Sequence, residues 1–171
     1  PTIIWLILIT LLRWLWHWNL LALWLGGLLG TFLLDIDHLF YSLIIYPQEE
    51  TSQRVKTLLK AQRYQEVISL LSITVNERIK LPLHSALFQV VFWVFCFWIL
   101  SSTNNLFVQG LVMAMALNLL KEELLLLLNH QDDFLRRKLF WQFKWSPSLK
   151  HQKAFIIFMV FFFVFFNLFL I

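Results

Sequence analysis

The stretch "GGLLGTFLLDIDH" at residues 26–38 holds the two features that decide this fold. It begins as an apolar run with Gly26 and Gly30 four residues apart, a small-residue face typical of packed membrane helices. It ends in two aspartates and a histidine. The surrounding apolar region, residues 2–46, is too long for one straight helix, because about 20 residues cross a bilayer. We expect two shorter helices, or a helix and a re-entrant segment.

The whole chain has the composition of a membrane protein. Of its 171 residues, 60% are hydrophobic and 14% charged, and the mean hydropathy is +0.71. A soluble domain of this size is less apolar. The 14 Lys and Arg residues are spread between apolar segments rather than gathered in a phosphate-binding patch, so we expect no nucleic-acid partner. The single Cys96 lies inside an apolar run and is interpreted as a buried, inert thiol.

Three further apolar segments have the length of membrane helices: 83–101, 106–128 and 154–171. Together with region 2–46 they predict an all-α fold, a polytopic membrane helix bundle of about four to five membrane helices. We expect one membrane domain over residues 1–171.

The loops predict the orientation of these helices. Segments 47–82 and 129–153 carry six Lys or Arg residues each, whereas "SSTNN" at 101–105 carries no charge. Positive loops stay on the cytoplasmic side, so both charged loops are expected there and 101–105 on the opposite side. Segment 47–82 is also expected to form a cytoplasmic insert of one or two amphipathic helices, because its apolar residues recur at helical spacing. The polar "KAQR" at 60–63 is the expected break between them.

Six charged residues fall inside the apolar segments: Arg13, Asp35, Asp37, Lys121, Glu122 and Glu123. An ionised side chain in the middle of a bilayer costs about 2.5–3.5 kcal/mol on insertion scales. Each therefore needs a partner, an ion or a water-filled cavity, and function is sought here first.

Three polar groups share one predicted depth near the charged loops. Asp35, Asp37 and His38 precede the first charged loop, and His84 follows it directly. On the third predicted helix, Asn118 and Glu122 are four residues apart and share a helix face near the second charged loop. Asp35 and His38 share a face as well, and a helix end at this point would let Asp37 converge with them.

Nitrogen and oxygen donors of this kind suit a divalent ion, with zinc first and manganese or iron next. The candidate metal ligands are Asp35, Asp37, His38, His84, Asn118 and Glu122. Asp37 and Glu122 are also the candidate catalytic residues. A metal-activated water is the chemistry that such a cluster supports.

These motifs have a counterpart in a known family. "GGLLGTFLLDIDH", followed by "LPLHS" (81–85), "GLVMAMALNLLKEE" (110–123) and "LFWQFKW" (139–145), resembles the YdjM-type inner-membrane metal-dependent hydrolases. That family carries Gly-x-Leu-Leu-Pro-Asp-x-Asp-His, then Thr-His-Ser, then His-x-x-x-Asp. The resemblance covers residues 17–145 and implies, by position, that Asp35, Asp37, His38 and His84 bind metal in a bacterial inner-membrane protein.

This sequence departs from the family pattern at three points. Leu34 stands where the family has proline, the residues before Thr-His-Ser differ, and Asn118 with Glu122 stands for the His-x-x-x-Asp pair. We hypothesise hydrolysis of a lipid or other phosphoester at headgroup depth, with membrane lipid as the partner. The alternative is a non-catalytic subunit of a larger membrane complex. Plain readings also stay open: an interfacial turn at residues 35–38, and interhelical hydrogen bonding by Asn118 and Glu122, for example to Arg13.

Overall fold

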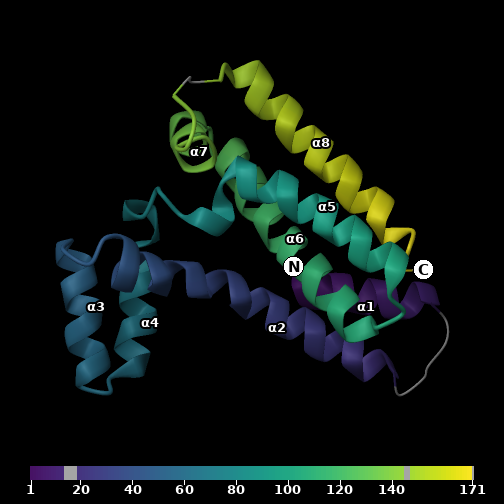
Figure 1. Cartoon of the computed structure of the whole chain (residues 1–171), viewed down its shortest axis with the longest axis horizontal. Coiled ribbons are helices and arrows are strands. Elements are labelled where there is room, and N and C mark those ends of the chain that lie inside the picture. The colour runs from purple at the N-terminus through teal and green to yellow at the C-terminus, as the bar shows by residue number, and fades with distance from the viewer. Residues whose placement is uncertain (14–18, 145–146, 171) are drawn as a thin grey trace.

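The computed structural model describes residues 1–13, 19–144 and 147–170, and all regular structure in these ranges is helical, which confirms the all-α class (Figure 1). Trp145 and Ile171, which belong to predicted segments, lie outside them. The helices are α1 (Thr2–Arg13), α2 (Asn19–Phe40), α3 (Glu50–Lys60), α4 (Tyr64–Ile73), α5 (Ala86–Ser102), α6 (Leu106–Leu128), α7 (Asp132–Leu139) and α8 (Leu149–Asn167). A π-helical piece, Tyr41–Ile45, extends α2, and short 3-10 helices lie at Val75–Glu77 and Pro82–His84.

Two of the described helices are long and apolar enough to cross a membrane. They are Leu20–Ile45, which is α2 with its π-helical extension, and α8, Leu149–Asn167. The predicted spans 83–101 and 106–128 form α5 and α6. Helix α5 has 17 residues, and α6 has 23 but carries three charged residues towards its end. Length and composition alone therefore identify two candidate spans.

Region 2–46 forms two helices of unequal length. Helix α1 has 12 residues and is about 18 Å long, shorter than the ~30 Å hydrocarbon core of a bilayer. Helix α2 continues without a break through Asp35, Asp37 and His38. The helix end considered at this point is therefore absent, and the polar residues obtain their partners from neighbouring elements instead.

The long helices run beside one another between two ends of the molecule (Figure 1). One end carries α3, α4 and α7, and the other carries the α5–α6 connection. A single apolar core joins α1, α2, α5, α6 and α8 and includes Leu23, Cys96, Met113 and Met159. Cys96 is 0% exposed, as its apolar context predicts.

Glycines set the distance between α2 and α6, the most extensive helix pair. A Cβ atom at Gly30 would lie 2.3 Å from the backbone oxygen of Leu111, and one at Gly26 would lie 1.9 Å from that of Phe107. From the other helix, a Cβ at Gly110 would lie 2.4 Å from the oxygen of Leu23. The two backbones touch where these side chains are missing, as small-residue membrane interfaces do.

Polar side chains also join the helices inside this apolar bundle. The Trp5 indole donates to Asn167 Oδ1 at 2.7 Å, which connects α1 to α8. The Trp24 indole donates to Thr10 Oγ1 at 3.1 Å, which connects α2 to α1. Such interhelical hydrogen bonds satisfy polar groups that are buried away from water.

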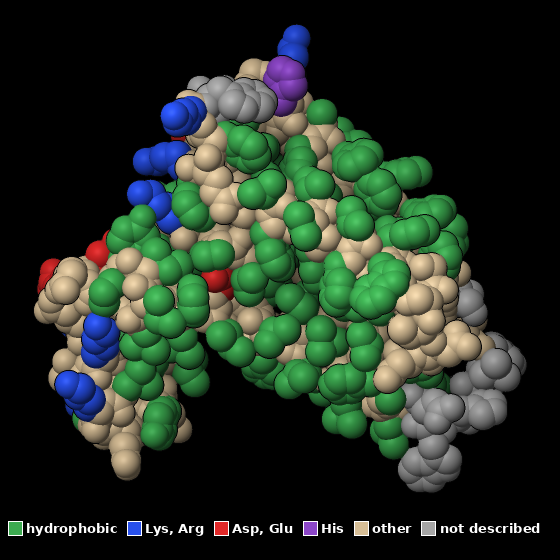
Figure 2. Space-filling view, viewed as in Figure 1, with side chains coloured by type: hydrophobic (Ala, Val, Ile, Leu, Met, Phe, Trp, Pro, Cys, Tyr) green, Lys and Arg blue, Asp and Glu red, His purple; other side chains and the backbone are tan. Residues whose placement is uncertain are grey.

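The predicted insert is a hairpin of α3 and α4, and the chain turns at Ala61–Arg63, where the break was predicted. Val55 and Val67 are buried in it, whereas Tyr64, Ile68 and Ile73 on α4 are exposed. Figure 2 shows hydrophobic side chains on the side of the hairpin that faces the helix bundle. The hairpin is therefore amphipathic, as its sequence indicates.

The α2–α6 contact makes a prediction about two neighbouring glycines. Gly30→Ala should destabilise the protein by roughly 1–3 kcal/mol, because the new methyl group meets rigid backbone. Gly27→Ala is the control: its Cβ would lie 2.9 Å from Leu6 Cδ2, the end of a side chain that can rotate away. Thermal unfolding in detergent measures both. Equal melting temperatures for the two variants would contradict the close contact.

Candidate functional site

The polar residues of the predicted site lie at the end of the bundle that carries α3, α4 and α7. Asp37 comes from the last turns of α2, Glu122 from the last third of α6, and His84 from the 3-10 turn before α5. That turn begins at Pro82 and is followed by Ser85, whose side chain accepts a hydrogen bond from Phe88 N and caps α5. The cap and the proline fix His84 just outside the helix. Asp37 and His84 are 3% and 6% exposed.

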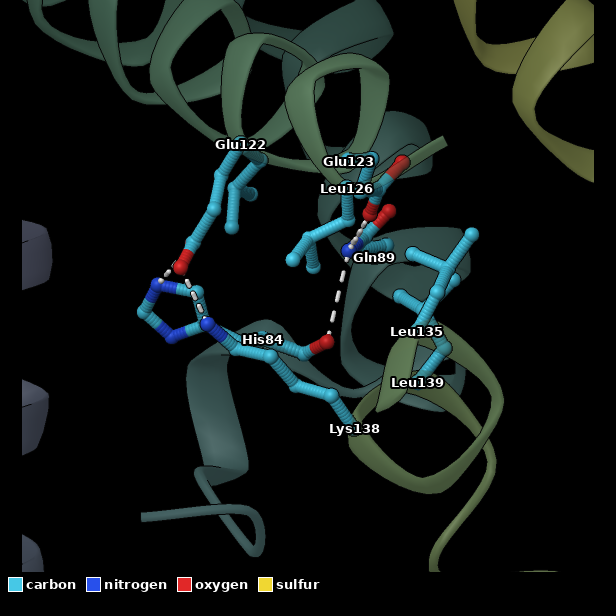
Figure 3. A pocket seen from close by; sticks show the side chains of 9 residues that line it. His84, Gln89, Glu122, Glu123, Leu126, Leu135, Lys138 and Leu139 are labelled. Carbon is cyan, nitrogen blue, oxygen red and sulfur yellow. Dashed lines mark hydrogen bonds and ion pairs between the residues drawn. The ribbon is translucent and has the colours of Figure 1, made fainter. Parts of the chain in front are cut away.

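Both ring nitrogens of His84 face carboxylates. Nδ1 lies 3.1 Å from Asp37 Oδ2, and Nε2 lies 3.1 Å from Glu122 Oε2. The Leu83 backbone N–H also donates to Asp37 Oδ2, at 2.9 Å, which holds that carboxylate in place. The other oxygen of Glu122 accepts from the ammonium group of Lys138 on α7 (Figure 3).

These contacts form a linear chain of four ionisable groups: Asp37, His84, Glu122 and Lys138. An imidazole that donates from both nitrogens is positively charged, so the charges along the chain alternate in sign and sum to zero. A buried charge is tolerated when it is paired and hydrogen-bonded. The alternation explains how an apolar bundle holds four such groups.

Helix α7 brings Lys138 into this chain. It places Asp132 and Asp133 in its first turn and three basic residues in its last, which suits the helix dipole. Leu135, Lys138 and Leu139 share the buried face of the helix, and the two leucines join a second apolar cluster. Packing of the leucines therefore delivers the lysine to Glu122.

His38 has a different partner. Its Nδ1 lies 3.1 Å from Nε of Arg78, which is 1% exposed and also donates to Thr74 Oγ1 at 3.0 Å. A guanidinium only donates, so Nδ1 of His38 accepts and carries no proton. Burial lowers the pKa of Arg78 from its ordinary value. The His38 and His84 rings lie 5.7 Å apart, so the arginine belongs to the same polar region.

Asp35 and Asn118 lie at the margins of this region. Asp35 is exposed, within electrostatic range of His84, Glu122 and Lys121. Asn118 accepts a hydrogen bond from Thr2 Oγ1 of α1 at 3.4 Å, and Thr2 in turn accepts from Thr31 of α2. The structure thus brings four of the six candidate residues together, leaves Asp35 exposed beside them and uses Asn118 in helix packing. Arg13, which was considered as its partner, lines a cavity with Asn104 and Asn105 near the opposite end.

A small cavity lies beside the chain of charges. Its volume is about 10 Å³, about the space that one water molecule requires. Figure 3 shows its lining residues: His84, Gln89, Leu119, Glu122, Glu123, Leu126, Leu135, Lys138 and Leu139. Gln89 donates to one oxygen of Glu123, and the other oxygen is buried without a protein partner in the described ranges. A water here would meet donors and acceptors together.

The donors present do not fit a divalent ion in this arrangement. Within residues 1–13, 19–144 and 147–170, no group of three His, Cys, Asp or Glu side chains could hold a metal ion. His84 has both nitrogens facing carboxylates, and both oxygens of Glu122 face cations. Lys138 and Arg78 supply positive charge to the site instead.

Three residues of this region are not predicted from the sequence: Lys138, Arg78 and Gln89. The first two were counted among the positive charges of the loops, and their burial at 3% and 1% reverses that interpretation. Helical spacing was an available signal for Lys138, because it follows Leu135 by three residues. Nothing in the local sequence marks Arg78.

Comparisons of the chain with protein family models, curated proteins and solved structures give no match.

The charge chain predicts a coupling between Lys138 and Glu122. Lys138→Met should lower the free energy of unfolding by roughly 2–4 kcal/mol, since it leaves the Glu122 carboxylate without its cation. Glu122→Gln in the Lys138→Met background should recover much of this loss. Denaturant unfolding of the two single variants and the double variant measures the coupling. Additive losses would contradict the pair.

Proposed function

We propose that the protein is a multi-pass membrane protein in which α5 and α6 also cross the bilayer. Two candidate spans, α2 and α8, flank these helices and share one core with them. Exposed Val94, Trp98 and Leu125 on α5 and α6 give these helices lipid-compatible surfaces. The positively charged loops support a cytoplasmic location for α3, α4 and α7, and the family resemblance supports a bacterial inner membrane.

Cysteine labelling tests this topology. The native Cys96 is 0% exposed, so background labelling should be low. In cells that make Lys56→Cys, a membrane-impermeant maleimide should react only after the membrane is opened. With Asn104→Cys, at the other end, it should react in intact cells. Reaction of both positions in intact cells would overturn the proposed orientation.

We propose further that the cluster around His84 hydrolyses a phosphoester of a lipid or other amphiphile at headgroup depth. One observation carries this proposal: Asp37 is buried behind Nδ1 of His84, while Nε2 points to Glu122, whose side chain is 32% exposed. A buried carboxylate behind one imidazole nitrogen is an arrangement found in general bases, and here the other nitrogen lies against the partly exposed Glu122.

In this proposal, the reaction begins when substrate and water reach the partly exposed Glu122 beside His84. Glu122 takes the proton from Nε2 and shifts away, which leaves the imidazole neutral. Nε2 then removes a proton from water as the water oxygen attacks phosphorus, the ester P–O bond breaks, and Glu122 gives its proton to the leaving ester oxygen. Asp37 stabilises the imidazolium that forms, and Lys138 supplies positive charge near the phosphate oxygens.

Hydrolysis is tested with purified protein in vesicles of phosphatidylglycerol and phosphatidylethanolamine, with release of soluble headgroup or phosphate as the readout. His84→Asn should lower the rate at least 100-fold, the effect of losing a general base. His130→Asn is the control, because His130 is exposed and lies in the connection after α6. Unchanged rates in the His84 variant would refute its role.

The second candidate is a non-catalytic subunit of a membrane complex. The charge chain favours it, because each group already has a partner and the cavity beside it admits about one water. In that case the wild-type chain releases nothing, and His84→Asn lowers only stability. Elemental analysis of the same samples addresses the metal: stoichiometric zinc, manganese or iron, lost in His84→Asn, would replace the metal-free mechanism.

A further inference from the structure

A second polar feature lies on the outer side of α7. It is a cleft of about 430 Å³, within the size range of small-molecule sites. Four basic side chains line it: Lys80, Arg136, Arg137 and Lys144. Figure 2 shows Lys and Arg side chains gathered along this edge of the molecule. The cleft is therefore strongly positive.

Ion pairs within the described residues neutralise little of this positive charge. Arg136 pairs with Asp133, with 3.0 Å between Nη2 and Oδ1, and Asp133 itself is exposed. Lys80 lies over the Tyr46 ring, 5.4 Å from its centroid, a contact that leaves the ammonium protons available. Arg137 and Lys144 are exposed, and Arg137 Nε donates to the backbone oxygen of Asp133 at 3.4 Å. Among the described residues, one carboxylate, that of Asp133, pairs with one of the four cations.

One wall of the cleft carries an indole group. Trp141 lines the cleft, and its indole Nε1 is buried with no hydrogen-bond partner in the described part of the chain. An indole N–H only donates, so Trp141 adds no negative charge to the cleft. Phosphate oxygens are acceptors that arginine and lysine bind.

The cleft lies beside the start of helix α8. Pro147 belongs to the cleft and precedes Leu149, the first residue of the candidate span α8. Phe140 and Trp141 add apolar walls, and aromatic side chains of this kind are enriched where membranes meet water. The cleft lies where lipid headgroups lie if α8 crosses the membrane.

We propose that this cleft binds the phosphate headgroup of an anionic phospholipid. The basic side chains attract the phosphate, and the ring of Trp141 forms part of the wall beside it. The acyl chains then follow the apolar surface of α8. This site is distinct from the His84 cluster and does not depend on the proposed hydrolysis.

Native mass spectrometry of the full chain in detergent tests the proposal. Dioleoylphosphatidylglycerol is the probe, dioleoylphosphatidylcholine is the zwitterionic lipid for comparison, and glycerol phosphate is the free phosphate ester. We expect retained phosphatidylglycerol in clear excess over both. Equal retention of phosphatidylcholine would overturn the role of charge. Preferential retention of glycerol phosphate would overturn the lipid assignment.

Two sets of variants locate the binding. Arg137→Gln with Lys144→Gln should weaken phosphatidylglycerol binding about 25-fold, since each basic residue near an anionic surface contributes roughly a factor of five. Lys56→Gln with Lys60→Gln removes the same charge from α3 and should change binding less than twofold. Equal effects of the two double variants would overturn the site.

Discussion

The close approach of α2 and α6 is the constraint on which the rest of the structure depends. Three glycines allow backbone contact, and a Cβ at any of them would lie 1.9–2.4 Å from a backbone oxygen of the other helix. Helices separated by ordinary side chains pack 8–10 Å apart. The helices held close by these glycines also carry Asp37 and Glu122, each of which lies 3.1 Å from a ring nitrogen of His84. The glycine contact therefore supports the polar cluster at the end of the helix pair.

This contact also explains why the cluster is a chain rather than a compact metal site. His84 enters between the two helices from a turn that Pro82 begins, and its ring separates Asp37 from Glu122. Because the imidazole separates the two carboxylates, each carboxylate contacts it from a different side. The carboxylates therefore do not meet at one metal ion. Lys138 completes the alternation from α7, so the group is neutral without an ion.

Much of the fold could be predicted from the sequence, and less of the site. The lengths of the apolar segments predicted the positions of α5, α6 and α8. The helical spacing of apolar residues predicted the two insert helices and the break between them at residues 61–63. Both signals are local in the sequence. The distance along the sequence from the charged loops predicted that Asp37, His84 and Glu122 share one depth. This signal is local as well. The partner of a charged side chain cannot be predicted from the local sequence. Arg78 and Lys138 have the sequence context of loop charges, but elements distant in the sequence bury them. Asn118 shares a helix face with Glu122, but it accepts a hydrogen bond from Thr2 because α1 lies beside it.

Helix α7 shows how local sequence and tertiary packing act together. Its eight residues present Lys138 to the buried Glu122 on one face and Arg136 and Arg137 to the basic cleft on the other. Burial of Leu135 and Leu139 orients both faces at once, so neither can turn without the other. An anionic headgroup held in the cleft would fix the same helix that neutralises Glu122. One short amphipathic helix thus sets both the charge balance inside the bundle and the position of the basic cleft outside it.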